Sequence, residues 1–541
     1  MFRLWAPAAE RVFLECPDTA PLEMTKADEG WWQIACPAKP GARYRFRIGD
    51  QSVPDPASRR QAGDVHGWSV VDDSNYAWRQ TWQPRPWEEA VIYELHVGLL
   101  GGFRAAAGIL SDLRETGITA IELMPIGDFP GARNWGYDGV LPYAPDEAYG
   151  TPDDLRFLID EAHGHGLMVF LDVVYNHFGP DGNYLPLYAP QFFRSDRKTP
   201  WGDAIDFREE PVRRFFIDNA LMWLEAFRFD GLRFDAVHAI RDAEFLVAMG
   251  EEIHTRLPGR HLILENEDND ARLLETYQAQ WNDDFHNTLH VMLTGEQAGY
   301  YAHYTEKPAA RLARILKEGF GFQGEGGRGI PSAHLPPTAF VSFLQNHDQT
   351  GNRALGERLI TLADERAVKA AVALQLLMPQ IPLLFMGEER GVSEPFLFFT
   401  DHNPELAEAV RKGRAAEFAK FPEFASGESK VPDPNAPETF ERSRIGVGNP
   451  AWQAFYREVL ALRRQEIVPR LKGAQAIDAE ALSEAAIIAS WRMGDGTTLV
   501  IATNLSPDPV QVPLRQSAPI YGSGDGDLVQ PFSTTVWIEP V

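Results

Sequence analysis

Gly231-Leu232-Arg233-Phe234-Asp235-Ala236-Val237-His238 reads as a short strand that ends in polar side chains. Apolar and polar residues alternate along it with the period of two expected of a strand. A strand of a parallel sheet is usually apolar on both faces, but here Arg233 and Asp235 are two positions apart and so share one face. Burying both costs free energy unless they are paired and used. Taken alone, the stretch fits a structural ion pair as well as a functional one.

The sequence around this stretch alternates strand-like and helix-like segments, which is typical of βα units and a parallel sheet. Eight such units predict a (β/α)8 barrel between residues 90 and 465. That span exceeds the roughly 250 residues typical of the fold, so we expect long insertions after strand 3 (177–210), strand 6 (286–338) and strand 8 (390–450). The predicted strands are Val91–Val97, Ile118–Ile126, Met168–Asn176, Gly231–Val237, Leu262–Glu267, Gln280–Asp284, Ala339–Asp348 and Pro382–Glu389.

Short strands separated by Gly and Pro clusters flank the barrel on both sides. Residues 1–85 predict an N-terminal β-sandwich that is immunoglobulin-like. Residues 466–541 predict a second, C-terminal β-sandwich. The expected fold class is therefore α/β, a TIM barrel flanked by two β-sandwich domains.

Composition limits the partners of the protein. The 541 residues carry a net charge of −26, which repels nucleic acid and anionic membranes and favours a neutral or cationic partner. The two cysteines, Cys16 and Cys36, form no disulfide framework or metal-ligand pattern and suggest a reducing compartment. The N-terminus does not resemble a signal peptide, and no apolar run is long enough to span a bilayer. We expect a cytoplasmic protein without membrane or nucleic-acid contacts.

Polar residues collect where the predicted strands end, and catalytic groups lie at these ends in this fold. Two carboxylates facing one cleft are what glycosidic bond cleavage requires. Arg233 beside Asp235 should lower its pKa and keep it ionised, which suits a nucleophile. Glu265 follows an apolar run, so burial should raise its pKa, which suits an acid. Asp348 is a third carboxylate that could bind sugar hydroxyls.

Aromatic residues near these ends could supply flat surfaces for a sugar ring: Trp135, Tyr137 and Trp281. A metal site is the competing interpretation. The histidines and carboxylates lie on different strands without a known ligand spacing, so we predict no metal and no cofactor.

Four motifs, Asp172–His177, Gly231–His238, the strand of Glu265, and Phe343–Asp348, resemble the α-amylase family of glycoside hydrolases in order and spacing. The resemblance covers nearly the whole chain, including both flanking sandwiches, and implies that the N-terminal one is similar to glucan-binding modules. It implies a retaining mechanism with Asp235 as nucleophile, Glu265 as general acid/base and Asp348 as transition-state stabiliser. It also implies that four residues hold the sugar at the cleavage point: Tyr137 as a stacking platform, His177, Arg233 and His347.

Within the family, the segments 233–240, 282–286, 347–354, 385–389 and 395–402 resemble the members that release trehalose. Those enzymes cleave the α-1,4 bond between a maltodextrin and a terminal trehalose unit. The resemblance implies malto-oligosyltrehalose as substrate and malto-oligosyltrehalose synthase as pathway partner. Further expected substrate contacts are Asp138, His238, Asn282, Asp283, Asp284, His286, Gln349 and Asn352.

Two other functions remain open from the sequence. A glycogen branching enzyme would share the domains and the three carboxylates but transfer the chain to a sugar hydroxyl. A non-catalytic glucan-binding protein would have no need to keep three costly carboxylates together. Two departures from the family pattern bear on substrate preference. Arg390 stands where a tryptophan usually follows Gly-Glu-Glu, and the loop after strand 1, Gly98–Phe103, is short.

Overall fold

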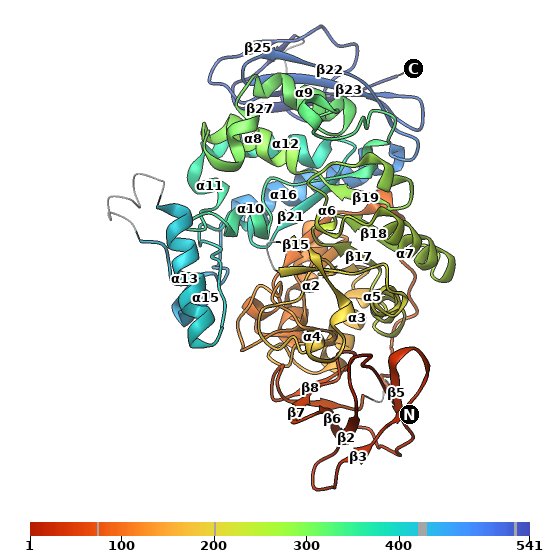
Figure 1. Ribbon diagram of the computed structural model, residues 1–541. Coiled ribbons are helices and arrows are strands. Elements are labelled where there is room, and N and C mark those ends of the chain that lie inside the picture. Colours follow the sequence, from red (N-terminus) through yellow and green to blue (C-terminus); the bar gives the residue numbers. More distant parts are fainter. Residues whose placement is uncertain (73–74, 200–201, 420–429, 524–526, 541) are drawn as a thin grey trace.

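The chain forms a central barrel with a β-sheet domain at each end (Figure 1). The computed structural model describes residues 1–72, 75–199, 202–419, 430–523 and 527–540. Eight parallel strands close the barrel in chain order, and each overlaps one of the predicted strands, which confirms the predicted fold class. They are β10 (Ile92–Leu95), β11 (Ala120–Leu123), β14 (Met168–Val173), β17 (Gly231–Phe234), β18 (His261–Leu264), β19 (Ala279–Trp281), β20 (Phe340–Ser342) and β21 (Ile381–Phe385).

Helices with an apolar face cover the outside of the barrel, as the sequence pattern predicts. At the start of α3, Thr151 and Asp154 form a reciprocal capping box and Pro152 occupies the first turn. The helices are α1 (Phe103–Ala106), α2 (Leu110–Thr116), α3 (Pro152–Gly164), α5 (Glu210–Ala226), α7 (Ala243–Arg256), α8 (Asp283–Thr294), α12 (Glu365–Leu377) and α16 (Pro450–Leu462).

Long segments interrupt the barrel after the strands named in the sequence analysis. The one after β14 contains α4 (Leu185–Tyr188) and the hairpin β15 (Phe193–Thr199) with β16 (Gly202–Ile205). The one after β19 contains α8 and α9 (Pro308–Glu318), and the one after β21 contains α13 (Pro404–Phe418) and α15 (Pro437–Arg442). A fourth insertion, which the sequence analysis missed, follows β11 and carries the hairpin β12 (Gly127–Asp128) with β13 (Leu141–Pro145).

The N-terminal domain packs two antiparallel sheets around an apolar core. One sheet is β1-β5-β4, and the other is β3-β2-β6-β9-β8 with β7 beside β6. Their bounds are β1 (Phe2–Trp5), β2 (Val12–Glu15), β3 (Leu22–Glu23), β4 (Thr25–Lys26), β5 (Trp31–Ile34), β6 (Arg43–Ile48), β7 (Gln51–Val53), β8 (Gln61–Ala62) and β9 (Trp68–Val70). Cys16 and Cys36 are both free thiols.

Hydrogen bonds join the N-terminal domain to the barrel insertion after β11. The Asp64 backbone N–H donates to Glu147 over 2.9 Å, and Asp64 Oδ2 accepts from the Gly131 N–H over 3.1 Å. The N-terminal domain therefore braces a loop of the barrel.

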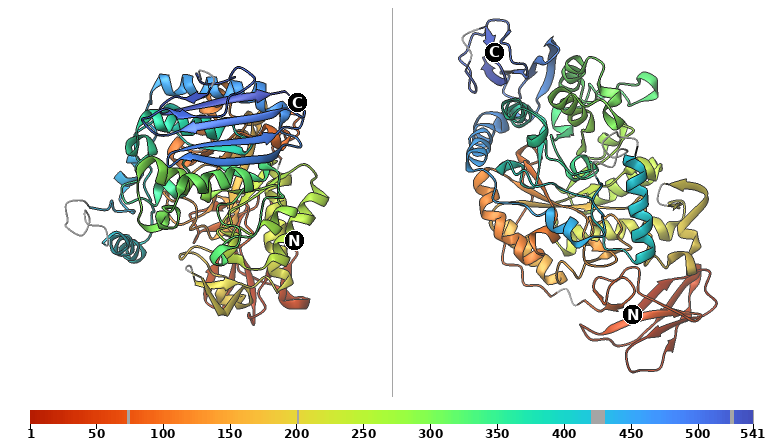
Figure 2. Two further views of the ribbon diagram at one scale, coloured as in Figure 1. Left: turned by 90° about the horizontal axis from the view of Figure 1, so that it is seen from above. Right: turned by 90° about the vertical axis from the view of Figure 1, so that its left-hand side faces the viewer.

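The C-terminal domain centres on a four-stranded antiparallel sheet, visible from above in Figure 2. Its strands are β22 (Gln475–Ser483), β23 (Ala486–Arg492), β24 (Thr498–Asn504) and β27 (Ser533–Glu539). The hairpin β25 (Val510–Gln511) and β26 (Leu528–Val529) adds a second layer over a small apolar core. Helices α9 and α12 lie against the main sheet, and Thr534 Oγ1 donates to the Ala370 carbonyl over 2.7 Å.

Across the described ranges, no helix combines the length and the apolar character needed to cross a membrane.

Candidate active site

Arg233 is the centre of a polar cluster at the carboxyl ends of the barrel strands. Its side chain is buried, and it stacks 4.1 Å above the ring of Trp281. Its Nη1 donates to Asp172 Oδ2 over 2.6 Å and to Asp235 Oδ1 over 2.9 Å. Its Nη2 donates to Glu265 Oε2 over 2.6 Å. One guanidinium thus joins carboxylates from three neighbouring strands, and the ion pair expected within Gly231–His238 is present.

Asp235 lies just beyond the end of β17, where the chain turns sharply. The next residue, Ala236, has a φ of +41°, in the left-handed region that non-glycine residues rarely adopt. The turn directs the Asp235 carboxylate toward Asn176, whose Nδ2 donates to Asp235 Oδ2 over 2.7 Å. Burial alone would raise the pKa of Asp235, but Arg233, His177 and the Asn176 hydrogen bond hold it below its ordinary value. These contacts favour the ionised form of Asp235.

Glu265 follows β18 and faces the same guanidinium, but its pKa moves the other way. Burial raises the pKa of Glu265 well above its ordinary value. The positive charge of Arg233 opposes this shift, and the carboxylates of Asp235 and Asp348 add to it. Oε2 accepts hydrogen bonds from Arg233 and from the Ala236 N–H, the latter over 2.9 Å. Since Oε2 makes both contacts, a proton on Glu265 belongs on Oε1.

Asp348 lies in α10 (His347–Gly351), the short helix that follows β20. The neighbouring His347 is fixed by Glu94 of β10, which accepts from the His347 backbone N–H over 2.8 Å and from Nδ1 over 2.5 Å. Asn352 Nδ2 donates to Asp348 Oδ1. Burial raises the pKa of Asp348, although His347 and Arg233 oppose the shift.

Tyr137 and His177 complete the floor of the cluster. The Tyr137 ring stacks on His347 with centroids 5.0 Å apart, and its hydroxyl donates to Asp172 Oδ2 over 2.6 Å. His177 Nε2 lies 2.9 Å from the Tyr137 carbonyl, and its Nδ1 lies 2.6 Å from Asn176 Oδ1. Through Tyr137, these contacts join two of the motifs quoted from the sequence, Asp172–His177 and Phe343–Asp348.

Several other residues predicted to contact the substrate lie around this floor, and their side chains are partly exposed to solvent. Asp138 accepts from Asn134 Nδ2 over 2.7 Å, and Gln349 Nε2 donates to Asp283 Oδ1 over 3.1 Å. Burial and the neighbouring Asp348 and Asp284 raise the pKa of Asp283 to about 7. The half-buried members of the predicted set are Tyr137, Asp138, His238, Glu265, Asp283, Asp348, Gln349 and Asn352.

Three predicted substrate contacts that follow β19 are instead buried and hydrogen-bonded to other parts of the protein. Asn282 Nδ2 donates to the Gly319 carbonyl over 3.0 Å. Asp284 accepts from the Tyr304 hydroxyl over 2.6 Å and from the Gly321 N–H over 2.7 Å. His286 Nδ1 donates to the Leu344 carbonyl over 2.7 Å. Their side chains support the loop that carries Asp283.

Two aromatic residues expected to offer open faces do not do so. Trp135 is 4% exposed, and its Nε1 donates to the Leu397 carbonyl over 3.0 Å. Trp281 is 1% exposed and lies beneath Arg233. The expectation that these two rings stack on a sugar is wrong, because both are needed to fill the space under the polar cluster. Tyr137 alone of the three remains partly accessible.

The sequence analysis did not assign roles to three residues that hold the cluster: Glu94, Asp172 and Asn176. Asp172 and Asn176 belong to a quoted motif, and Asp172 is the register partner of Arg233. Glu94 is a charged residue in the otherwise apolar β10. A carboxylate inside a buried strand was the signal that could have found it.

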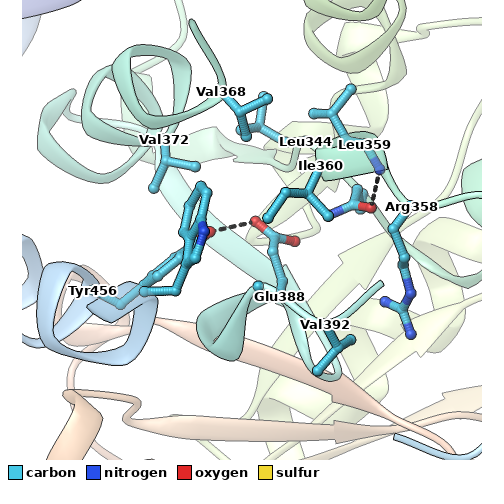
Figure 3. Close-up of a pocket in the computed structure, with 12 residues that line it drawn as sticks. Leu344, Arg358, Leu359, Ile360, Val368, Val372, Glu388, Val392 and Tyr456 are labelled. Carbon is cyan, nitrogen blue, oxygen red and sulfur yellow. Dashed lines mark hydrogen bonds between the residues drawn. The ribbon is translucent and has the colours of Figure 1, made fainter. Parts of the chain in front are cut away.

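Arg390 points away from the cleft. Its Nε lies 3.1 Å from Glu389 Oε1, and its Nη2 lies 3.3 Å from Asp112 Oδ2 on α2. The adjoining Glu388 borders a cavity of about 10 Å³, room for about one water, between the barrel and α12 (Figure 3). The Tyr456 hydroxyl donates to Glu388 Oε1 over 2.9 Å. This segment joins the barrel to its outer helices and does not line the polar cluster.

The structure gives no sign of a metal centre: in the ranges it describes, no three His, Cys, Asp or Glu side chains are grouped to hold an ion.

The family models match the three parts of the fold. Residues 95–186 match the alpha amylase catalytic domain, residues 1–62 match carbohydrate-binding module 48 (isoamylase N-terminal domain), and residues 474–532 match a domain of unknown function. Together with the closed barrel and the carboxylate cluster, these matches define a glycoside hydrolase of the α-amylase family.

Two curated relatives identify a particular group of enzymes within the α-amylase family. The chain is 43% identical to the malto-oligosyltrehalose trehalohydrolase of Deinococcus radiodurans over 86% of this chain and 81% of that protein. It is 39% identical to the enzyme of that name from Arthrobacter ramosus over 95% and 94% of the two chains. The chain belongs to the malto-oligosyltrehalose trehalohydrolase family.

Two solved structures and one further curated protein also resemble the chain to different degrees. The crystal structure of a proposed alpha amylase from Salmonella typhimurium has 44% sequence identity to this chain. The two structures superpose with a TM-score of 0.94, over 100% of this chain and 97% of that one. A pullulanase from Paenibacillus barengoltzii, 20% identical with a TM-score of 0.72 over 100% and 93% of the two chains, shares the fold. The branching enzyme of Nitrosococcus oceani is a more distant match, 30% identical over 48% of this chain and 40% of that one.

Proposed function

We propose that this glycoside hydrolase cleaves the α-1,4-glucosidic bond next to the terminal trehalose of malto-oligosyltrehalose, with retention of configuration, and releases trehalose and a malto-oligosaccharide. One observation carries the chemical part of the proposal. Asp235 and Glu265 share the guanidinium of Arg233, yet the pKa of Asp235 is lowered and that of Glu265 is raised. An ionised and a protonated carboxyl side by side are the pair that a retaining glycosidase uses.

In the first step, an Asp235 oxygen attacks the anomeric carbon of the glucose next to the trehalose unit. The bond from that carbon to the trehalose oxygen breaks, and Glu265 donates its proton to this oxygen, so trehalose leaves as a neutral molecule. Asp235 is then covalently bonded to the malto-oligosyl chain. Its carboxylate is suited to attack because Arg233 and Asn176 hold it ionised and oriented.

In the second step, Glu265, now ionised, removes a proton from a water molecule. The water oxygen bonds to the anomeric carbon, the bond to Asp235 breaks, and the malto-oligosaccharide leaves. Two inversions give net retention. We predict roughly 5–5.5 Å between the two carboxyl groups, the separation of retaining enzymes.

Asp348, His347, His177 and Tyr137 are proposed to hold the glucose that is attacked. Support comes from the stacking of Tyr137 on His347 and the contact of His177 with the Tyr137 carbonyl, which place these side chains around Asp235 and Arg233. Asp348 would bind sugar hydroxyls more strongly as the ring distorts. Asp138, His238, Asp283, Gln349 and Asn352 are proposed further sugar contacts.

A malto-oligosyltrehalose synthase is the proposed pathway partner, because a reaction that forms the 1,1-linkage at a chain end must supply this substrate. We propose a cytoplasmic location from the two free cysteines, which suit a reducing compartment.

The test is to incubate the protein with maltotriosyltrehalose and with amylose and to identify the products. We expect free trehalose and maltotriose from the first, with the new reducing end appearing initially as the α-anomer by NMR. New branch points on amylose would instead identify a branching enzyme, the second candidate, a class to which the Nitrosococcus protein is a more distant match. Binding of glucan with no product from either substrate would identify a non-catalytic protein.

A further inference from the structure

His96 is a buried histidine that the proposed mechanism does not use. It directly follows β10, and it is 1% exposed. Its Nδ1 accepts a hydrogen bond from the Leu99 backbone N–H over 3.1 Å, and its Nε2 lies 2.8 Å from the Asn134 carbonyl oxygen. Because Nδ1 accepts, the ring proton belongs on Nε2, which donates it to the Asn134 carbonyl. His96 therefore joins the short loop after β10 to the insertion after β11.

The His96 ring is neutral and is held from several sides. Burial lowers the pKa of His96 to about 4, so the ring carries no charge at neutral pH. The Tyr149 hydroxyl donates to the same Asn134 carbonyl over 3.1 Å. Phe399, from the insertion after β21, meets the His96 ring edge-on with centroids 5.1 Å apart. A Cβ at Gly98 would lie only 2.7 Å from the Tyr149 ring and 2.9 Å from the His96 ring, so the loop packs closely on both.

The Asn134 side chain connects this bond to Asp138, one of the proposed sugar contacts. Asn134 Oδ1 accepts from the Gly136 N–H over 2.8 Å, and Nδ2 donates to Asp138 Oδ2 over 2.7 Å. The same Asp138 oxygen lies 3.5 Å from His402 Nε2. Asn134 therefore closes a turn at Gly136 and holds the Asp138 carboxylate, while its own backbone is held by His96.

We propose that His96 is a positioning residue whose Nε2–H fixes Asn134 and, through the Asn134 side chain, the Asp138 carboxylate. This inference rests on the proposed function, in which Asp138 contacts the substrate. His96 itself is buried and bonds to Asn134, so its effect on the reaction passes through that residue. A misplacement of about 1 Å away from the reacting bond can cost on the order of a hundredfold in rate. The loss of the bond should therefore appear in kcat/KM.

Two substitutions separate the two hydrogen bonds of His96. The amide nitrogen of a glutamine reaches as far along the side chain as Nε2, so His96→Gln can still donate to the Asn134 carbonyl. The amide of an asparagine reaches only as far as Nδ1, so His96→Asn can keep the Leu99 bond but loses the Asn134 bond. With maltotriosyltrehalose as substrate, His96→Asn should lower kcat/KM by on the order of tenfold, and His96→Gln should stay within about threefold of the wild type.

His261 is the matched control for the loss of a buried histidine. It is 5% exposed, and its Nε2 lies 2.9 Å from the Arg85 carbonyl oxygen. Because His261 is the first residue of β18, it lies at the opposite end of the barrel from the polar cluster. His261→Asn should lower the Tm but leave kcat/KM for maltotriosyltrehalose within about threefold of the wild type.

Two further variants test the route through Asn134 and Asp138. Asn134→Ala keeps the carbonyl that His96 binds but removes the amide that holds Asp138. It should show the same loss of kcat/KM, which tests the route even if His96→Asn does not fold. Asp138→Ala removes the carboxylate that His96 is proposed to place. In the Asp138→Ala background, His96→Asn should lower kcat/KM by less than about threefold further, because the two changes act on one interaction.

Three results would overturn the inference while leaving the proposed function intact. In the first, either His96→Asn or Asn134→Ala has the kcat/KM of the wild type. In the second, His96→Gln loses as much kcat/KM as His96→Asn. In the third, the full loss caused by His96→Asn persists in the Asp138→Ala background. A wild-type enzyme that releases no trehalose would overturn the proposed function itself, so the two failures are distinguishable.

Discussion

Asp235 and Glu265 differ in function because their surroundings differ, although one arginine touches both. Asp235→Asn keeps the shape but removes the nucleophile, and Glu265→Gln keeps the shape but removes the transferable proton. We expect each to lower kcat by several orders of magnitude, because both groups act mainly in the transition state. Steady-state kinetics with maltotriosyltrehalose measures the effect, and circular dichroism checks the fold. Near-normal turnover by a folded variant would disprove its role.

The opposite pKa shifts predict the pH dependence of the reaction. Asp235 must be ionised, and its lowered pKa preserves this state until the pH falls through that value. Glu265 must carry a proton, which is lost as the pH rises through its raised pKa. The plot of kcat/KM against pH should therefore be bell-shaped. Its acidic limb should lie at low pH, where Asp235 gains a proton, and its alkaline limb should follow the loss of the proton from Glu265. An alkaline limb that persists in the residual activity of Glu265→Gln would refute this assignment.

Glu122 is a buried carboxyl group that should lower the free energy of unfolding at neutral pH. It is fully buried on β11, register partner of Glu94, and its two oxygens have no hydrogen-bond partner among the residues described. Burial and then the Glu94 and Asp172 carboxylates raise the pKa of Glu122 well above 4.5. The folded state holds this proton and the unfolded state does not, so stability falls as pH rises from about 4.5 toward the folded pKa.

Glu122→Met should therefore stabilise the protein at pH 7, by about 1–3 kcal/mol, and reduce the fall in Tm between pH 5 and pH 7. The matched control is Glu94→Gln in the same layer. It should lower the Tm, because Glu94 accepts two hydrogen bonds from His347. Calorimetry at both pH values measures the difference, and a lower Tm for Glu122→Met at pH 7 would contradict the expectation.

At the scale of elements, the insertion after β19 positions part of the cleft. Asp284 accepts hydrogen bonds from Tyr304 and Gly321, which tie the start of α8 to the chain beyond it. Tyr304→Phe removes one bond to a buried carboxylate and should cost about 1–3 kcal/mol of stability. Because Tyr304 is buried and bonds to Asp284, which is not among the proposed sugar contacts, kcat should change less than threefold. Thermal unfolding and kinetics separate the two effects, and a large loss of kcat without a change in Tm would contradict this placement.

The sequence predicted the elements well where the pattern was strong. All eight barrel strands and the flanking sheets follow from short apolar or alternating runs bounded by turn signals. The hairpin of β12 and β13 was missed because two-residue and five-residue strands leave little periodic signal. The strand around Arg233 also ends earlier than predicted, at Phe234, because the turn at Ala236 interrupts it.

The candidate site was predictable in its charged residues and not in its packing. Polar residues at strand ends indicated a common cleft, since parallel strands end on one side of a barrel. Burial depends on what covers a side chain from distant segments, and sequence spacing does not report this. Trp281 lies beneath Arg233, and Asn282, next in the chain, bonds to Gly319.

At the scale of the whole molecule, the net charge of −26 should not affect the encounter with substrate. Malto-oligosyltrehalose is neutral, so the field of the protein neither attracts nor repels it. We expect kcat/KM to change less than about twofold between 20 and 500 mM NaCl, the range over which exposed charges become screened. Stopped assays at several salt concentrations measure this. A steep salt dependence would indicate a charged substrate or partner.

The bond between Glu94 and His347 spans 253 residues, and β10 pairs with β21 to close the barrel. A growing polypeptide presents Glu94 long before its partner exists. At about 5–20 residues per second, the ribosome needs on the order of tens of seconds to reach His347. During that interval the first strands have no closing neighbour and their apolar faces are uncovered. We therefore expect the newly made chain to need protection of these apolar faces until the eighth strand has been translated.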